Sequence, residues 1–192
     1  MDATPSSAEV YISVDIETAG PNPGDYSLLT IGACKVSDLQ RMFYVELQPV
    51  NAKFVPEALA ISRLSMERLA KRGQPPKTAM AQFEEWVLAQ TAEGEKAVFV
   101  AFNAAFDWMF VNDYFFRYLG HNPFGHTALD IKSFFMGLAG VTWEETTKRY
   151  IVPRYLSNQQ FTHHALRDAM DQGQIFSKML EEAKRRSKED NL

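Results

Sequence analysis

Two acidic side chains interrupt an apolar stretch near the start of the chain, VYISVDIET at residues 10–18. Side chains of a β-strand alternate between its two faces, so Asp15 and Glu17 are expected to point to the same side. Two carboxylates that close repel each other unless one takes up a proton or a cation lies between them. A divalent metal ion is therefore one interpretation of the pair. The other is that one carboxylate faces water where the strand ends and the turn residues 20–24 begin, and this stretch alone does not distinguish them.

Two further acids lie in stretches that have helical periodicity. Asp107 is followed at three and four residues by Phe110 and Val111, which predicts a largely buried carboxylate that must be paired, hydrogen-bonded, protonated or bound to metal. The alternative for Asp107 is a helix-dipole role, worth ~0.3–1 kcal/mol. Asp168 lies at the edge of the apolar stripe of the last helix and, taken alone, is expected to be solvated. Together the four acids favour Mg²⁺ or Mn²⁺, because these hard cations prefer oxygen ligands. Two neighbouring metal ions also need several carboxylates from different helices and strands.

Composition places the chain among ordinary globular proteins. It has 192 residues, 46% hydrophobic and 23% charged, which predicts one domain spanning residues 1–192, with a polar segment at 1–9 and a solvated tail from about 187. Its single cysteine cannot form an internal disulfide, and the polar start has no signal-peptide pattern, so a cytoplasmic protein without membrane contact is expected. The net charge of −4 argues against coating nucleic acid by bulk electrostatics but permits a local site.

The elements that must position the acids are predicted from apolar periodicity and turn residues. Strands are expected at residues 10–18, 28–36, 42–50, 97–102 and 126–131, and helices at 77–90, 103–120 and about 164–186. Asn103 is expected to cap the second of these helices, and Thr142 with Glu145 forms a capping-box pattern ahead of one more helix. This order predicts an α/β fold: a mixed five-stranded sheet, three antiparallel strands and then parallel strands, flanked by helices.

The acids also fall into three ordered motifs: VDIET at residues 14–18, NAAFD at 103–107 and HHALRD at 163–168. In type, spacing and order these motifs resemble those of the DnaQ-like 3′-5′ exonucleases, the DEDDh family, which have an RNase H-like fold. The resemblance implies a metal-dependent 3′-5′ exonuclease that hydrolyses the terminal phosphodiester of DNA or RNA to nucleoside 5′-monophosphates. It leaves two alternatives: a catalytically silent binding module or subunit, and an endonuclease or phosphatase with the same two-metal chemistry.

The resemblance also assigns roles to individual residues. It implies that two Mg²⁺ or Mn²⁺ ions are held by Asp15, Glu17, Asp107 and Asp168. It implies that Thr18, Ala19 and Phe106 help to hold the terminal nucleotide. The expected partner is a nucleic acid with a free 3′ end, single-stranded rather than duplex, and the protein itself is expected to be a monomer or a homodimer.

Two departures from the family pattern concern substrate contacts. Ala19-Gly20 stands where many members have Thr-Gly, and Ser62-Arg63 stands where some proofreading members have His-Gly. The polar segment at residues 151–161 is interpreted as a loop over the site. Basic residues that could follow a nucleic-acid backbone, although scattered cations are more often a solvated face, are Lys148, Arg149, Arg154 and Arg167.

Two adjacent histidines compete for the role of general base. His164 lies four residues before Asp168 and would share its face of a continuous helix, whereas His163 would point about 140° away. The family spacing favours His163, which is possible if the helix begins only at about His164. We therefore predict His163 as the base, because an imidazole with a pKa of ~6.5 is neutral and basic at cellular pH.

Overall fold

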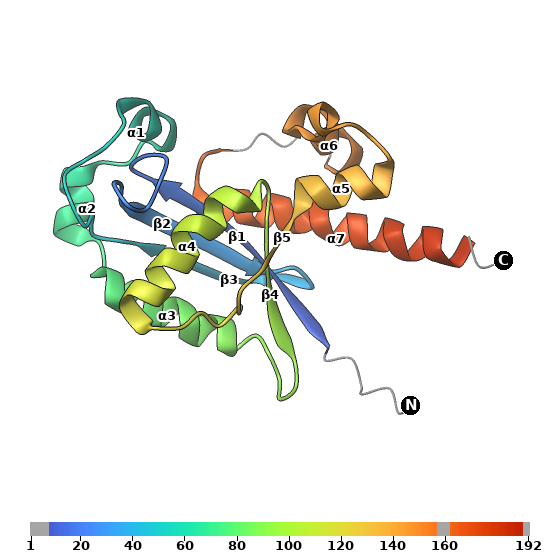
Figure 1. Ribbon diagram of the computed structural model, residues 1–192, viewed down its shortest axis with the longest axis horizontal. Coiled ribbons are helices and arrows are strands. Elements are labelled where there is room, and N and C mark those ends of the chain that lie inside the picture. The colour runs from blue at the N-terminus through green and yellow to red at the C-terminus, as the bar shows by residue number, and fades with distance from the viewer. Residues whose placement is uncertain (1–7, 157–161, 190–192) are drawn as a thin grey trace.

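The computed structural model describes residues 8–156 and 162–189, and one five-stranded sheet organises them (Figure 1). The strands are β1 (Glu9–Thr18), β2 (Leu28–Lys35), β3 (Asp38–Glu46), β4 (Lys96–Ala101) and β5 (Ala128–Asp130). The helices are α1 (Pro56–Ser62), α2 (Met66–Arg72), α3 (Pro76–Leu88), α4 (Ala104–Leu119), α5 (Ile131–Ala139), the 3₁₀ helix η1 (Trp143–Thr146), α6 (Lys148–Tyr155) and α7 (Ala165–Glu189). The strand order is β3-β2-β1-β4-β5. β3, β2 and β1 are antiparallel neighbours while β1, β4 and β5 are parallel, which confirms the predicted mixed sheet.

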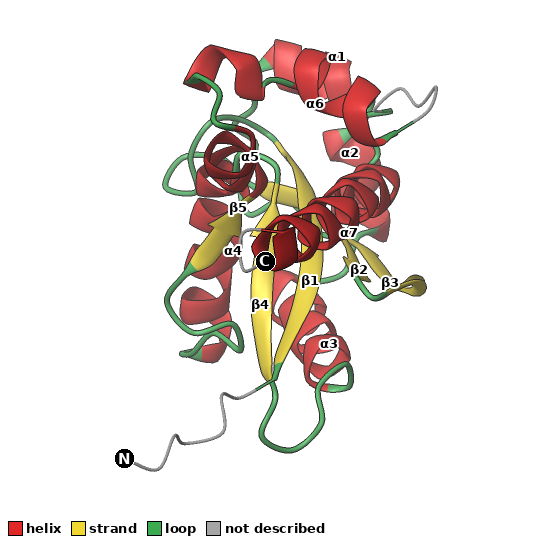
Figure 2. Ribbon diagram, turned by 90° about the vertical axis from the view of Figure 1, so that its right-hand side faces the viewer, coloured by secondary structure: helices red, strands yellow, loops and turns green. Residues whose placement is uncertain are grey.

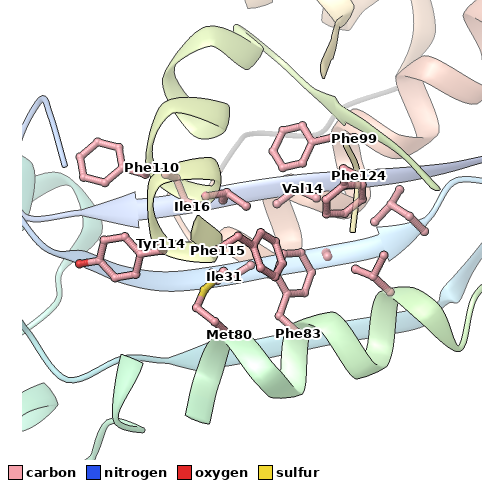
Figure 3. Packing of buried hydrophobic residues seen from close by; sticks show 14 of the residues in the cluster. Val14, Ile16, Ile31, Met80, Phe83, Phe99, Phe110, Tyr114, Phe115 and Phe124 are labelled. Atoms are coloured by element: carbon pink, nitrogen blue, oxygen red, sulfur yellow. The ribbon is translucent and has the colours of Figure 1, made fainter. Parts of the chain in front are cut away.

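α3 and α4 cover one face of the sheet with an aromatic core (Figure 3). Phe83 of α3 stacks on Phe115 of α4 with ring centroids 5.6 Å apart, and Phe124 lies within 6.0 Å of Phe83. Val14 and Ile16 of β1 enter the same core, as alternation along a strand requires. The neighbouring side chains of β1 therefore face the opposite side of the sheet.

α5, α6 and α7 cover that opposite face (Figure 2), where Val100 of β4 meets Phe135, Ile151 and Phe176. α7 is the long helix that follows the sheet in Figure 1. Ser13 donates a hydrogen bond from its hydroxyl to the Ala169 carbonyl of α7 at 2.7 Å. Both faces of β1 are thus covered, so a polar side chain on this strand needs a partner.

Two glycines let α7 lie unusually close to the sheet. A Cβ on Gly32 of β2 would lie 2.2 Å from the backbone carbonyl carbon of Ala165, and one on Gly173 would lie 3.1 Å from Cys34 Sγ. Gly32 pairs with Asp15 in the register of β1 and β2. The first turn of α7 is therefore held directly over the strands beside Asp15.

Several predicted boundaries were wrong. β3 begins at Asp38, not near residue 42, because the hairpin connection is short and Lys35 already pairs with Asp38. Polar residues of this edge strand hid its start in the sequence. Helices α1, α2 and α5 were not predicted, although Ser65 and Asp130 accept N-cap hydrogen bonds at α2 and α5.

Two predicted caps differ in detail. Asn103 occupies the position before α4, but in a left-handed conformation (φ 68°), and its side chain makes no capping hydrogen bond. Asp130 replaces it, because its Oδ1 accepts from the Ala104 N–H at 3.0 Å. Thr142 and Glu145 do form the capping box, but it heads the 3₁₀ helix η1 and not an α-helix.

The segment predicted as a loop at residues 151–161 is partly helical. Residues up to Tyr155 belong to α6, and Ile151 is fully buried, because its apolar side chain fills the core under α5 and α7. The remainder, residues 157–161, lies outside the described residues. Within the described part of the chain, no helix is both long enough and apolar enough to cross a membrane.

Candidate active site

Three elements bring the four acids to one edge of the sheet. Asp15 and Glu17 lie toward the carboxyl end of β1, where the register with β2 shifts between Glu17 and Thr18. Asp107 lies in the first turn of α4, just beyond the end of the parallel strand β4, and Asp168 lies in the first turn of α7. Carboxyl ends of parallel strands meet at the same edge, so the topology itself gathers these elements.

Asp107 is tied directly to β1. The residue is 5% exposed, and its Oδ1 accepts a hydrogen bond from the Ile16 N–H at 3.2 Å. Ile16 lies between Asp15 and Glu17 in the sequence, so this bond places α4 against the acidic part of the strand. The predicted burial of Asp107 is confirmed.

Asp168 is also buried, and the expectation of a solvated helix residue was wrong. It is 2% exposed because Gly32 lets the start of α7 contact the sheet. Oδ1 accepts a hydrogen bond from the Thr162 N–H at 2.9 Å, and Oδ2 accepts one from the His163 N–H at 3.2 Å. The carboxylate therefore orders the backbone that precedes its own helix and fixes where His163 stands.

Burial and repulsion between carboxylates make Asp15, Glu17 and Asp107 hard to ionise. Burial raises the pKa of Asp15 well above its ordinary value, and the nearby carboxylates of Asp107, Asp168 and Glu17 raise it further. The pKa of Glu17 is raised to about 7, mainly by burial and to a smaller extent by the charge of Asp168. Burial raises the pKa of Asp107 to about 8, although backbone N–H groups, including that of Ile16, favour its charged form. The acids thus lie within electrostatic range of one another.

Lys148 is the cation that opposes this repulsion. It is half-buried at the start of α6, and its charge lowers the pKa values of Asp15, Glu17 and Asp107 against the effect of burial. Its Nζ lies 5.7 Å from the centre of the Phe102 ring. The sequence pointed to Lys148 only as one of several scattered cations, because nothing in its own segment reveals that α6 folds toward β1.

The acids fit a divalent metal ion in donor type and in charge. Mg²⁺ and Mn²⁺ prefer oxygen ligands, and a cation relieves the repulsion that the raised pKa values express. Within residues 8–156 and 162–189, no three histidine, cysteine or acidic side chains already form a set of metal ligands. The predicted convergence of the four carboxylates on shared ion positions therefore stays a prediction.

Both histidines lie just before the start of α7. The helix begins at Ala165, and the Asp168 N–H bonds to the His164 carbonyl, so both histidines precede the helix, as the choice of His163 requires. His163 has a left-handed backbone (φ 53°) and is exposed. His164 is also exposed, but its ring stacks on Tyr44 with centroids 5.0 Å apart.

The predicted substrate residues have different surroundings. The Thr18 hydroxyl donates to the Gly20 carbonyl at 2.8 Å. Phe106 is half-buried beside Asp107, and the centroid of its ring lies 5.5 Å from that of Phe110. Ala19 is fully buried, with its side chain in a small cluster and its backbone N–H and carbonyl both hydrogen-bonded. Ala19 therefore shapes the end of β1 from within.

A cleft of about 470 Å³ adjoins Asp168 on the β3 side. Its lining comes from β3, the α1–α2 connection and the start of α7, namely Tyr44, Glu46, Ser62, Arg63, Leu64, Arg68, Thr162, His163, His164 and Arg167. The departure at Ser62-Arg63 thus lies on the wall of a basic cleft, with Arg63 in a left-handed conformation (φ 57°). Arg68 is paired with Glu46 in that wall, and Arg154, in contrast, is paired with Glu182 away from it.

With the acids of β1, α4 and α7 gathered at the carboxyl edge of a mixed sheet, comparison with known proteins identifies the class of protein. The family model RNase_T, described as an exonuclease, matches residues 12–176. The 3′-5′ DNA exonuclease Cap18 of Escherichia coli is 44% identical over 168 residues, covering 88% of this chain and 90% of that protein. The chain belongs to the exonuclease family, as a DnaQ-like 3′-5′ exonuclease of the DEDDh type.

Solved structures with low sequence identity share the fold. The nuclease domain of 3′hExo, a DEDDh family member bound to rAMP, superposes with a TM-score of 0.76 at 14% identity and covers 93% of this chain and 94% of that one. Escherichia coli exonuclease I in complex with a dT13 oligonucleotide gives 0.66 at 13% identity, over 90% of this chain and 40% of that one. The fold is the RNase H-like fold, as the sequence motifs implied.

Proposed function

We propose that this 3′-5′ exonuclease removes nucleoside 5′-monophosphates from single-stranded DNA in a reaction that requires two divalent metal ions. The observation that carries the proposal is the set of four mutually repelling, buried or half-buried carboxylates at one edge of the sheet. Asp15, Glu17, Asp107 and Asp168 would hold Mg²⁺ or Mn²⁺ there. Such ions supply Lewis-acid chemistry, which activates water and stabilises charge on the leaving 3′-oxygen.

The side chains of this chain supply binding and proton transfer. A ring nitrogen of His163 accepts the proton of the attacking water, and the hydrogen bonds from residues 162 and 163 to Asp168 hold the histidine's backbone next to the acids. Phe106 packs against the terminal base, and Thr18 orders the turn that contacts its sugar. Lys148 offers a positive charge to the terminal phosphate from the side of α6.

DNA is favoured over RNA by the relative with 44% identity, and a single strand is favoured by one of the solved structures. The 44% identical protein is named a DNA exonuclease, and the match to the exonuclease family model, residues 12–176, includes all four acids. Exonuclease I, which has the same fold, was solved with an oligothymidine strand. Arg63, Arg68 and Arg167 line a cleft beside Asp168 along which a DNA backbone would pass.

Matched 3′-labelled substrates test the proposal. Single-stranded DNA, duplex DNA and the same sequence as RNA are incubated with Mg²⁺ or Mn²⁺, with and without a chelator. We expect mononucleotides from single-stranded DNA first, no release with the chelator, and no release by Asp107→Asn. Release that persists in Asp107→Asn would contradict the assigned site, and faster release from RNA would contradict the assigned substrate.

A further inference from the structure

Gln172 is a buried amide that no motif singled out. It lies on α7 one turn after Asp168 and is 1% exposed. Its Nε2 donates to the Val14 carbonyl at 2.8 Å, and its Oε1 accepts from the Phe102 N–H at 2.6 Å. The amide orientation follows from these partners, since a carbonyl can only accept and an N–H can only donate.

These two bonds lie where β1 and β4 part. The parallel pairing of the strands extends from Glu9 with Lys96 to Ser13 with Val100. Toward the acidic edge, Val14 is the next residue of β1 after Ser13, and Phe102 lies two residues after Val100, just beyond the end of β4. The Gln172 amide thus bridges the two strands beyond their last paired residues: its NH₂ group bonds to the β1 side and its carbonyl to the β4 side.

The bridge joins the three elements that carry the acids. Val14 directly precedes Asp15, and Phe102 precedes the turn into α4, whose first turn carries Asp107. Gln172 shares α7 with Asp168. One amide therefore links the backbones on which three of the four acids stand, and a change in its length or polarity shifts them relative to one another.

We propose that Gln172 is a positioning residue that sets the spacing of Asp15, Asp107 and Asp168 for metal binding and turnover. This inference rests on the proposed function, because it concerns the same four acids. Residues that support metal ligands from behind typically change metal affinity or activity ~10–100-fold when replaced. A buried glutamine with a purely structural role would lower stability and leave both quantities unchanged.

Two substitutions and a matched control separate these roles. Gln172→Met keeps the length of the side chain but removes both hydrogen bonds, and Gln172→Asn keeps the amide but is too short to span both partners. Gln90→Met is the control: Gln90 is also buried (7% exposed), and its amide donates to the Trp86 carbonyl at the end of α3, away from the acids. For each protein, melting, Mn²⁺ binding by calorimetry, and kcat and KM on single-stranded DNA are measured below the lowest melting temperature.

We expect Mn²⁺ affinity and kcat to fall ~10-fold or more in both Gln172 variants, with KM within about threefold of wild type. Gln90→Met is expected to melt earlier with unchanged kcat and Mn²⁺ affinity. If the Gln172 variants resemble Gln90→Met, or if both fail to fold, Gln172 has a structural role and the inference is wrong. Asp107→Asn is measured in parallel: if it remains active, the failure lies in the proposed site and not in Gln172.

Discussion

At the scale of single residues, the cost of burying charge distinguishes the site more clearly than its hydrogen bonds do. Asp107 and Asp168 are nearly inaccessible, their carboxylates accept mainly backbone N–H groups, and the charge of Lys148 offsets only part of the effect of burial on the pKa of Asp107. Burying an ionised carboxylate costs several kcal/mol. Buried acids with perturbed pKa values cluster at functional sites, and for this reason we interpret the acids as metal ligands.

Asp15→Asn is expected to abolish mononucleotide release while stabilising the protein in the presence of a chelator. The substitution removes a metal ligand and also one of the charges that repel Asp107 and Glu17. We expect a gain of roughly 0.5 to 2 kcal/mol in the free energy of unfolding, measured by urea denaturation. Asp25→Asn, at an exposed acid paired with Lys53, is the control that should retain full activity. Loss of folding in Asp15→Asn would indicate a structural carboxylate.

His163→Ala is expected to lower kcat by ~10²-fold or more, because we propose the imidazole of His163 as the proton acceptor. Mn²⁺ binding measured by calorimetry should persist, since no role as ligand is assigned to this side chain. His164→Ala should leave kcat nearly unchanged and lose only the ring contact with Tyr44. A reversed pattern in single-turnover kinetics would make His164 the base.

At the scale of elements, the start of α7 does most to create the site. Gly32 lets this helix lie close to β2. The first turn of α7 carries the buried Asp168 and follows directly after His163 and His164. The parallel pair β1 and β4 then brings α4 to the same edge. A small change in the height of α7 above the sheet therefore alters the acids and the histidine together.

Gly32→Ala is expected to be destabilising by ~1–3 kcal/mol and to reduce activity, because its new Cβ would lie 2.2 Å from backbone atoms of α7. A backbone neighbour cannot turn away as a side chain does. Gly137→Ala is the matched control: nothing lies within 4 Å of its Cβ position in α5, so the gain in helix propensity should stabilise the protein by ~0.5–1 kcal/mol. Thermal melting and kcat are measured for both, and equal behaviour would show that α7 does not depend on the close approach.

At the scale of the whole molecule, the acids are expected to make the stability of the protein depend on pH and, through the proposed metal site, on metal. Three carboxyl groups, those of Asp15, Glu17 and Asp107, keep their protons to higher pH in the folded state than in the unfolded state, where their ordinary pKa values apply. Glu17 has a pKa of about 7 against 4.5, and Asp107 of about 8 against 3.8. The unfolded state therefore binds fewer protons over this range, and folding is favoured at the acidic end.

With a chelator present, the free energy of unfolding is expected to fall as pH rises from about 4 to about 8, the window set by these pKa values. Glu17→Gln should reduce this slope below about pH 7, because the glutamine has no proton to release. Urea denaturation at a series of pH values measures the slope for both proteins, and identical slopes would contradict the assigned cause. Saturating Mn²⁺ should flatten the wild-type curve, since binding to the folded state stabilises it.

Local sequence determined the element types around the acids and the identity of the acids themselves. The alternation in VYISVDIET gave β1 and the shared side of Asp15 and Glu17, and the apolar neighbours of Asp107 predicted its burial. These features depend on side-chain period, which a sequence displays directly. The order of the predicted strands and helices was sufficient to predict the mixed sheet, and the three ordered motifs were sufficient to predict the exonuclease family.

Only the tertiary structure decided which helices pack against which strands around the acids. The burial of Asp168, the turn of Lys148 toward the acids and the Gln172 bridge all depend on helices that approach strands more than a hundred residues away in the sequence. The caps show the same limit: Asn103 had the right type and position, yet Asp130 from another strand makes the bond to the start of α4. Local periodicity carries no information on such distant contacts, because close packing selects them only when the whole chain is folded.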